Sequence, residues 1–337
     1  MSRLDPGMAG YNYLLYPDGT ALDDVYLYRL ASQRYFLVVN AANAERDWDW
    51  LDAVNSGQIT IETSLPGGSL KHVDGPVELR NLRGPGDVRL IDLALQGPRS
   101  LDVLSTLVHD DDVARFKRLA MNEHTRVGLK GGEAMVARTG YTGELLGYEL
   151  FVDPDRAVEV FQAILDAGRD VGLLPCGLGA RDSTRTEAGF PLFGHELEGP
   201  HAGTLTESDY GFVPRFHVPF FIGRSAYMAR VRPRRRKMAR LAGQGRKSLR
   251  PGHLILNDDR QPAGVVTSFA YLNDALDFVV LAYVDVGLDT TPGRQIEGLR
   301  MTSPPDGDVD AAKIVELTAM RRFPDVEERT GWADRYA

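Results

Sequence analysis

The sequence predicts an α+β protein that ends in a small β-barrel, and three observations support this prediction. Before about residue 230, segments rich in aromatic and β-branched residues alternate with segments of helical spacing. Hairpin signals are mixed with this alternation, which favours an α+β layer over a doubly wound parallel sheet. After that point, short apolar runs are separated by Asn, Asp, Gly and Pro clusters, a pattern typical of small barrels.

The chain opens with a predicted β-meander. Segments 11–16, 25–30 and 35–40 are rich in Tyr, Phe, Leu and Val, and "PDGT" is a turn signal between the first two. A helix should follow from Ala44, because apolar residues recur there at i, i+4 and i+7. Asn43 is its expected N-cap.

Strands and helices alternate through the middle of the chain. "VRLIDLALQG" predicts a strand that ends at Gly97, and "RSLDVLSTLV" predicts a helix after it. "EAMVARTGY" and "GYELFV" predict two further strands. A helix from Pro154 to about Ala167 should follow, with Asp153 as its N-cap.

A change of composition near residue 230 indicates a domain boundary. "RVRPRRRKMAR" is strongly basic, and the runs "HLIL", "AGVVTSFAY", "FVVLAYVDV" and "RQIEGLR" follow it. We therefore expect a first domain over residues 1–228, a barrel over residues 232–324 and a charged tail over residues 325–337. The basic run is expected to form a face between domains, in preference to a phosphate or RNA site.

The composition argues against several classes of protein. With 337 residues, 43% of them hydrophobic, the chain can bury one large core or two ordinary ones. It has no apolar run long enough for a membrane span and no signal-peptide pattern, so we expect a cytoplasmic protein without a membrane partner. The net charge of -8 argues against a nucleic-acid partner.

The sequence gives no sign of a metal or nucleotide-cofactor site. Cys176 is the only cysteine, so an internal disulfide is impossible, and we expect it to be buried as a small apolar residue. No histidine has metal-ligand spacing, and P-loop and dinucleotide-binding glycine motifs are absent. The "HDDD" segment at residues 109–112 is more typical of a solvated helix end than of a metal site.

The segment "CGLGARDSTRTEAGFPLFGHEL", residues 176–197, predicts a short helix with a polar face. The helix should run from Gly179 to Ala188 and stop at Gly189 in the left-handed conformation. Glu187 lies on its small, semi-polar face at helical spacing. A carboxylate held in this way can accept two parallel N–H donors from a planar heterocycle.

Two arginines of the same helix need acidic partners. Arg181 and Arg185 form an i, i+4 like-charge pair, which is mildly unfavourable unless each finds a carboxylate. Asp182 is expected to be too close in sequence to face either of them well. The local pattern therefore supports a salt-bridge helix between domains and a ligand-binding helix about equally.

Two turn segments carry further candidate site residues. Asp23 and Asp24 begin a predicted strand, so they should point to opposite faces and only one of them can face a site. Paired Asp residues at a turn more often reflect turn chemistry than function. In "RTGYTGE", Gly140 and Gly143 bracket Tyr141, and the loop either makes a tight turn or lets its backbone approach a ligand.

Together these motifs resemble the aminomethyltransferase family, which includes the T-protein of the glycine cleavage system and relatives that demethylate small molecules onto tetrahydrofolate. Six strings follow the family's order and cover almost the whole chain: "LDPGMAGYNYLLYPDGTALDDVYLYRL", "YFLVVNAANAERDWDWL", "LALQGP", "RTGYTGELLGYELFV", "CGLGARDSTRTEAGFPLFGHEL" and "AGVVTS". The resemblance implies a T-protein-like cloverleaf of folate-binding subdomains followed by a small C-terminal β-barrel.

The resemblance also implies roles for individual residues. Asp24 would be the catalytic carboxylate that approaches the reacting nitrogens of folate, and Glu187 would grip the pterin ring. The other residues implied to line the folate pocket are Tyr11, Asn40 and Tyr141. Arg215 would replace a basic contact that the glycine-cleavage branch makes in the linker "GFVPRFHVPFFIGRSAY".

The implied reaction transfers a one-carbon unit from the aminomethyl-lipoyl arm of an H-protein-like carrier to tetrahydrofolate and releases ammonia. A tetrahydrofolate-dependent demethylase of a small methylated substrate is an alternative, because the linker is closer to the branch that contains dimethylglycine and sarcosine enzymes and folate-dependent demethylases. The substrate would be an amine like dimethylglycine or sarcosine, a sulfonium or an aryl ether. A folate-binding protein without catalysis is an alternative of another class. The tRNA-modification branch is disfavoured, because its "KGCYxGQE" string is absent.

The chain departs from the family pattern in two places. It begins almost at the "LDPGMAGY" element, which the family precedes with a further segment, so we expect that the start site lies further upstream or that the gene is truncated or split. "GELLGYE" has one residue more than the family's usual "GELGYE", which predicts a bulge in the strand after Tyr141.

Overall fold

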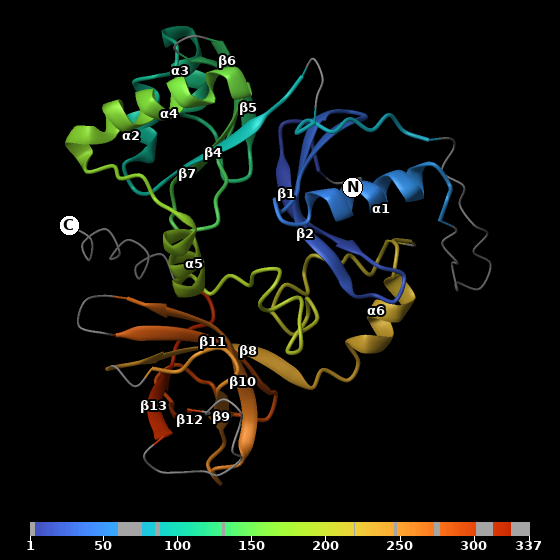
Figure 1. Cartoon of the computed structure of the whole chain (residues 1–337), viewed down its shortest axis with the longest axis vertical. Helices are drawn as coiled ribbons and strands as arrows, with labels where there is room; N and C mark the ends of the chain where they lie inside the picture. Colours follow the sequence, from blue (N-terminus) through green and yellow to red (C-terminus); the bar gives the residue numbers. More distant parts are fainter. Residues whose placement is uncertain are drawn as a thin grey trace. The chain divides into compact units, whose positions relative to one another are not determined.

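The computed structural model describes residues 4–59, 76–84, 88–129, 132–218, 220–245, 248–272, 277–300 and 313–324. Its contacts divide the chain into two compact units (Figure 1). Unit 1 comprises Met1–Leu14, Asp23–Cys176 and Arg329–Ala337, and unit 2 comprises Leu15–Leu22 and Gly177–Glu328. The charged tail expected over residues 325–337 lies outside the described residues.

The first sheet has the strand order β1-β2-β3. Its strands are β1 (Ala9–Leu15), β2 (Ala21–Ala31) and β3 (Arg34–Val38). β2 and β3 pair antiparallel, with Tyr26 opposite Val38. Helix α1 (Ala44–Asn55) follows β3, so the predicted order of three strands and a helix is confirmed.

The second sheet of unit 1 has the strand order β4-β7-β6-β5, and all of its pairs are antiparallel. Its strands are β4 (Ile91–Gln96), β5 (His124–Leu129), β6 (Gly132–Ala137) and β7 (Gly147–Val152). The helices α2 (Ser100–Ser105), α3 (Asp110–Phe116) and α4 (Pro154–Gly168) pack against it, and a short 3-10 turn, η1 (Arg169–Val171), follows α4. Their shared core includes Leu104, Phe116, Leu150 and Ile164.

The extra residue of "GELLGYE" does not bulge the strand that follows it. β7 pairs with β4 in continuous register from Gly147 opposite Gln96 to Val152 opposite Ile91. The prediction of a bulge was wrong, because residues 143–146 lie in the turn before β7 and absorb the insertion outside the ladder.

The two predicted N-caps have opposite outcomes. Asp153 caps α4, since its Oδ1 accepts a hydrogen bond of 2.8 Å from the backbone N–H of Asp155. Asn43 precedes α1 but does not cap it with its side chain. The Asn43 amide instead donates to Asp23 Oδ1 at 2.7 Å, so the prediction of a side-chain cap was wrong.

Unit 2 contains a closed six-stranded barrel with the strand order β10-β11-β8-β13-β12-β9 (Figure 1). The strands are β8 (Arg236–Gly243), β9 (Leu254–Leu256), β10 (Pro262–Tyr271), β11 (Phe278–Asp285), β12 (Gln295–Leu299) and β13 (Ile314–Ala319). Buried apolar residues from all six strands fill it, among them Leu241, Ile255, Val266 and Phe278. This barrel confirms the predicted C-terminal fold.

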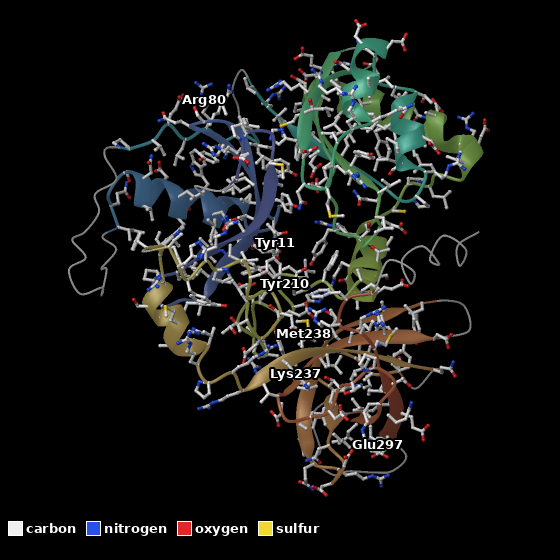
Figure 2. All side chains as sticks on the ribbon, turned by 180° about the vertical axis from the view of Figure 1, so that it is seen from behind. Tyr11, Arg80, Tyr210, Lys237, Met238 and Glu297 are labelled. Atoms are coloured by element: carbon white, nitrogen blue, oxygen red, sulfur yellow. The ribbon has the colours of Figure 1, made fainter. Side chains whose placement is uncertain are left out.

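The basic run contributes a strand to the barrel. Its second half forms β8, in which Met238 and Ala239 are buried, and Arg236 places its guanidinium 4.9 Å from the centre of the Tyr283 ring. Figure 2 shows Lys237 and Met238 on this strand. The arginines of the run hid the buried stretch 238–241 of this strand, because their long stems can cover apolar surface.

Helix α5 (Leu178–Glu187) lies within one residue of its predicted limits. Gly189 follows it with a φ of 79°, and a Cβ there would lie 2.4 Å from the carbonyl oxygen of Arg322. Both the left-handed conformation and this close approach require glycine. Cys176 is exposed just before the helix, so the prediction that it is buried was wrong.

Candidate active site

Two buried aspartates of β2 share one amide partner in unit 1. Asp23 is fully buried and Asp24 is 8% exposed. Asn40 Nδ2 donates to Asp23 Oδ1 at 2.9 Å and to Asp24 Oδ1 at 2.6 Å. Asp23 also accepts hydrogen bonds from the Asn40 backbone N–H at 3.0 Å and from Asn43 Nδ2 at 2.7 Å. Both aspartates therefore belong to one polar cluster, although they are consecutive in the strand.

Tyr11 completes the environment of Asp24. It lies on β1 (Figure 2), and its hydroxyl donates to Asp24 Oδ2 at 2.6 Å. The same hydroxyl lies 2.8 Å from that of Tyr13. The structure thus brings together Tyr11, Asp24 and Asn40, three of the residues that the sequence predicts for the site.

Asp24 is held by neutral donors alone. Each of its two carboxylate oxygens accepts one short hydrogen bond, from Tyr11 or from Asn40. Among the residues that the structure describes, no basic side chain forms an ion pair with it. Burial raises the pKa of Asp24 above its ordinary value, while the hydrogen bonds from Tyr11 and Asn40 oppose that rise.

Sequence reasoning missed a second carboxylate network in unit 1, which surrounds the partly buried Glu149. Glu149 on β7 accepts a hydrogen bond of 2.9 Å from the Tyr28 hydroxyl and another from the Thr139 hydroxyl, both at Oε2. Tyr28 is fully buried, and this burial raises the pKa of its hydroxyl far above the ordinary value. The available signal was a charged residue inside the apolar run "GYELFV".

The loop that carries Tyr141 is shaped around Gln96. A Cβ on Gly140 would lie 2.0 Å from Gln96 Oε1, so the glycine leaves space for that side chain. Gln96 donates to the carbonyl of Thr139 at 3.2 Å and accepts from the Thr142 hydroxyl at 3.1 Å. Gly140 therefore serves a close approach within unit 1, and Tyr141 is only partly buried in the loop.

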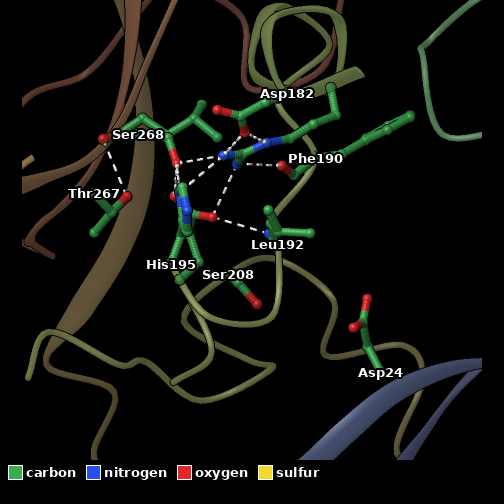
Figure 3. Close-up of polar contacts among 12 residues, drawn as sticks. Asp24, Asp182, Phe190, Leu192, His195, Ser208, Thr267 and Ser268 are labelled. Carbon is green, nitrogen blue, oxygen red and sulfur yellow. Dashed lines mark hydrogen bonds and ion pairs between the residues drawn. The ribbon is translucent and has the colours of Figure 1, made fainter. Parts of the chain in front are cut away.

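Arg185 of unit 2 lies in a closed ion-pair network (Figure 3). Its side chain is 1% exposed and donates to Asp182 Oδ1 at 2.8 Å, to Glu196 Oε2 at 3.0 Å and to the Ser268 hydroxyl at 2.8 Å. The prediction that Asp182 would not face Arg185 was wrong, because i, i+3 residues are neighbours on a helix surface. The network ties α5 to β10 of the barrel.

The remaining predicted residues also lie in unit 2. Glu187 is the last residue of α5 and is 4% exposed. Arg215 is exposed in the irregular segment before α6 (Arg224–Arg230). The two residues thus differ in character, since Glu187 belongs to the interior and Arg215 to the surface.

The described residues contain no group of His, Cys, Asp and Glu side chains that could hold a metal ion. The "HDDD" segment is the start of α3, where Asp112 accepts a hydrogen bond of 2.6 Å from the backbone N–H of Gly128. No helix in the described ranges is both long enough and apolar enough to cross a membrane.

Comparisons with known proteins identify the family. The model of the GCVT N-terminal domain matches residues 1–213. The aminomethyltransferase of Chlorobaculum tepidum is 34% identical over 269 residues, which are 80% of this chain and 66% of that protein. The aminomethyltransferase of Halothermothrix orenii is 33% identical over 298 residues, which are 88% of this chain and 74% of that protein.

A solved structure supports the same fold. The crystal structure of glycine cleavage system aminomethyltransferase T from Bartonella henselae matches with a TM-score of 0.69 and 24% sequence identity. The match covers 94% of this chain and 76% of that one. This chain spans about two thirds to three quarters of the length of these relatives. The predicted fold class is confirmed, and the chain belongs to the aminomethyltransferase family.

Proposed function

We propose that this protein is a tetrahydrofolate-dependent aminomethyltransferase. It would move a one-carbon unit from the aminomethyl-lipoyl arm of a carrier protein to tetrahydrofolate, with release of ammonia. Membership of the aminomethyltransferase family supports this reaction class. The observation that carries the proposal is the cluster of Tyr11, Asp24 and Asn40 in unit 1.

The environment of Asp24 suits the proposed reaction. A folate nitrogen that takes up a one-carbon unit develops positive charge and must lose a proton. A buried carboxylate with a raised pKa and no ion-pair partner among the described residues can stabilise that charge and accept that proton. Tyr11 and Asn40 each hold one oxygen of Asp24, so they fix its orientation toward the reacting nitrogen.

The hydrogen-bond acceptors of the site also suit a reduced pterin. The cluster offers carboxylate and hydroxyl oxygens as acceptors, and a reduced pterin offers ring and exocyclic N–H donors. We assign the paired N–H groups of the pterin to Glu187, which would accept them in a bidentate, charge-assisted contact. Tyr141 and Arg215 would contribute further contacts to folate. These three assignments rest on the sequence resemblance.

A titration of the full chain with tetrahydrofolate, followed by calorimetry, tests the proposal at its first step. Binding is expected, and methylenetetrahydrofolate should then form when the aminomethyl-lipoylated carrier is added. Formation of methyltetrahydrofolate by methyl transfer from a small methylated amine, sulfonium or aryl ether, in place of the carrier, would move the assignment to demethylation. An absence of tetrahydrofolate binding would contradict both readings.

A further inference from the structure

Asp47 on α1 is a buried carboxyl group that the proposed reaction does not use. Its side chain is 1% exposed, and neither of its oxygens accepts a hydrogen bond from any described residue. The Asp47 backbone N–H donates to the carbonyl of Asn43 at 2.9 Å, and the Asn43 amide donates to Asp23 at 2.7 Å, so α1 holds Asp47 next to the Asp23 carboxyl, which acts on it electrostatically. A buried anion without a donor and beside a second carboxylate is strongly disfavoured, so this arrangement requires an explanation.

The hydrogen-bond donors are distributed unevenly over the three carboxyl groups of the cluster. Asp23 accepts from three N–H groups, supplied by Asn40 and Asn43. Asp24 accepts from Tyr11 and Asn40. Donors stabilise the ionised form of a carboxyl group, so the member without any donor among the described residues is the one that should keep a proton.

The charges that act on Asp47 lead to the same conclusion. Burial raises the pKa of Asp47 to about 8, and the carboxyl groups of Asp23 and Asp24 contribute to that rise. Arg46, the preceding residue of α1, opposes it. The neighbouring carboxyl groups therefore act on Asp47 in the same direction as its burial, and both favour its protonated form.

We propose that Asp47 is a positioning residue: a neutral carboxylic acid that donates its O–H to the Asp23 carboxylate and thereby fixes the Asn40 amide that holds Asp24. The contacts form one continuous series. Asp23 binds both the backbone N–H and the side-chain amide of Asn40, and that amide lies 2.6 Å from Asp24 Oδ1. The effect on turnover rests on the proposed function, whereas the protonation of Asp47 does not.

This arrangement predicts a fall of turnover in alkaline solution. When Asp47 loses its proton, Asp23 faces a second negative charge in place of a donor, and the contacts that orient Asn40 weaken. The folded-state pKa of about 8 sets the pH of the fall. In the Asp47→Asn variant, the side-chain amide would still present an N–H donor to Asp23 and would not titrate.

The test compares Asp47→Asn and Asp47→Ala with the wild-type chain and with Asp49→Asn, an exposed carboxyl two residues along the same helix. Turnover and the KM for tetrahydrofolate are measured on both sides of pH 8. Asp47→Asn should keep its turnover within about threefold at neutral pH and lose the alkaline fall. Asp47→Ala should lose about tenfold in kcat with little change in KM, and Asp49→Asn should match the wild type.

A second measurement does not depend on activity. The infrared spectrum of the folate-free wild-type chain at neutral pH should contain a protonated carboxylic acid band. Subtracting the spectrum of Asp47→Asn, measured at the same pH, should isolate that band. Absence of that band, or an alkaline fall that persists in Asp47→Asn, would overturn the inference. A band that is present in a chain that does not bind tetrahydrofolate would contradict the proposed function and leave Asp47 as the protonated group.

Discussion

The two units each bury carboxylates, but they satisfy them in different ways. In unit 2, Glu196 is fully buried against the guanidinium of Arg185, and Ser268 and the backbone N–H of Leu192 supply further donors. In unit 1, Asp23 and Asp24 meet only amide and hydroxyl donors among the described residues. The first cluster contains an ion pair, and among the described residues the second does not.

This difference distinguishes structural from catalytic carboxylates more clearly than their burial does. A buried ion pair with complete hydrogen bonding has no free capacity to move a proton, and its role is to hold elements together. A buried carboxylate with neutral donors keeps its charge at a cost in folding free energy, and such unbalanced groups concentrate at functional sites. The contrast therefore favours a structural role for Arg185 and a catalytic role for Asp24.

The largest effect on stability is expected from breaking the buried ion pair of Arg185 and Glu196. Arg185→Met leaves Glu196 as an uncompensated buried charge, so the free energy of unfolding should fall by about 3 to 5 kcal/mol. Urea denaturation followed by circular dichroism measures this change. Arg181→Met, on the exposed face of the same helix, should cost less than about 1 kcal/mol. Equal effects of the two variants would show that the Arg185 network is not structural.

A second experiment compares Glu187 and Glu149 as the carboxylate proposed to bind the pterin. Glu187→Ala should weaken tetrahydrofolate binding about 100-fold, or about 3 kcal/mol, because it would remove the bidentate contact that we propose for Glu187. Glu149→Gln is the matched variant in unit 1, where Glu149 is already held by Tyr28 and Thr139. Calorimetric titration measures both. A loss of affinity confined to Glu149→Gln would show that the pterin is bound by Glu149 and not by Glu187.

A smaller effect, on turnover, is expected from removing one hydrogen-bond donor of Asp24. Tyr11→Phe deletes the hydrogen bond to Asp24, and turnover should fall about tenfold. That hydrogen bond lowers the pKa of Asp24, so its loss should raise this pKa and move the acidic limb of the pH–rate profile to higher pH. Tyr13→Phe is the control, because the Tyr13 hydroxyl contacts Tyr11 and not Asp24. An unshifted acidic limb in Tyr11→Phe would argue against Asp24 as the proton acceptor.

Local signals in the sequence predicted much of the fold. Asp153 and Pro154 mark the start of α4, and Gly189 marks the end of α5, because caps act through the nearest backbone groups. β8 was missed because its arginines resemble a solvated linker. β5 was missed because only a few apolar residues mark it, and its place is fixed by pairing with β6.

The site was less accessible to sequence reasoning. Motif order alone selected Tyr11, Asp24 and Asn40, and no local pattern could show that two strands and the segment after a third bring them together. The role of Asn43 also depends on a long-range contact. Its side chain donates to Asp23 and does not cap the helix. Glu149 and Asp47 escaped notice because their significance lies in partners that are distant in sequence or in the lack of a donor among the described residues.

The most direct test of the catalytic role of Asp24 measures binding and turnover of Asp24→Asn side by side. The amide keeps the shape of the carboxylate but carries no charge and accepts no proton. If Asp24 is the proton acceptor, Asp24→Asn should bind tetrahydrofolate within about threefold of the wild-type affinity and should lose about 100-fold or more in kcat. Unchanged turnover in a chain that binds tetrahydrofolate normally would contradict this role of Asp24.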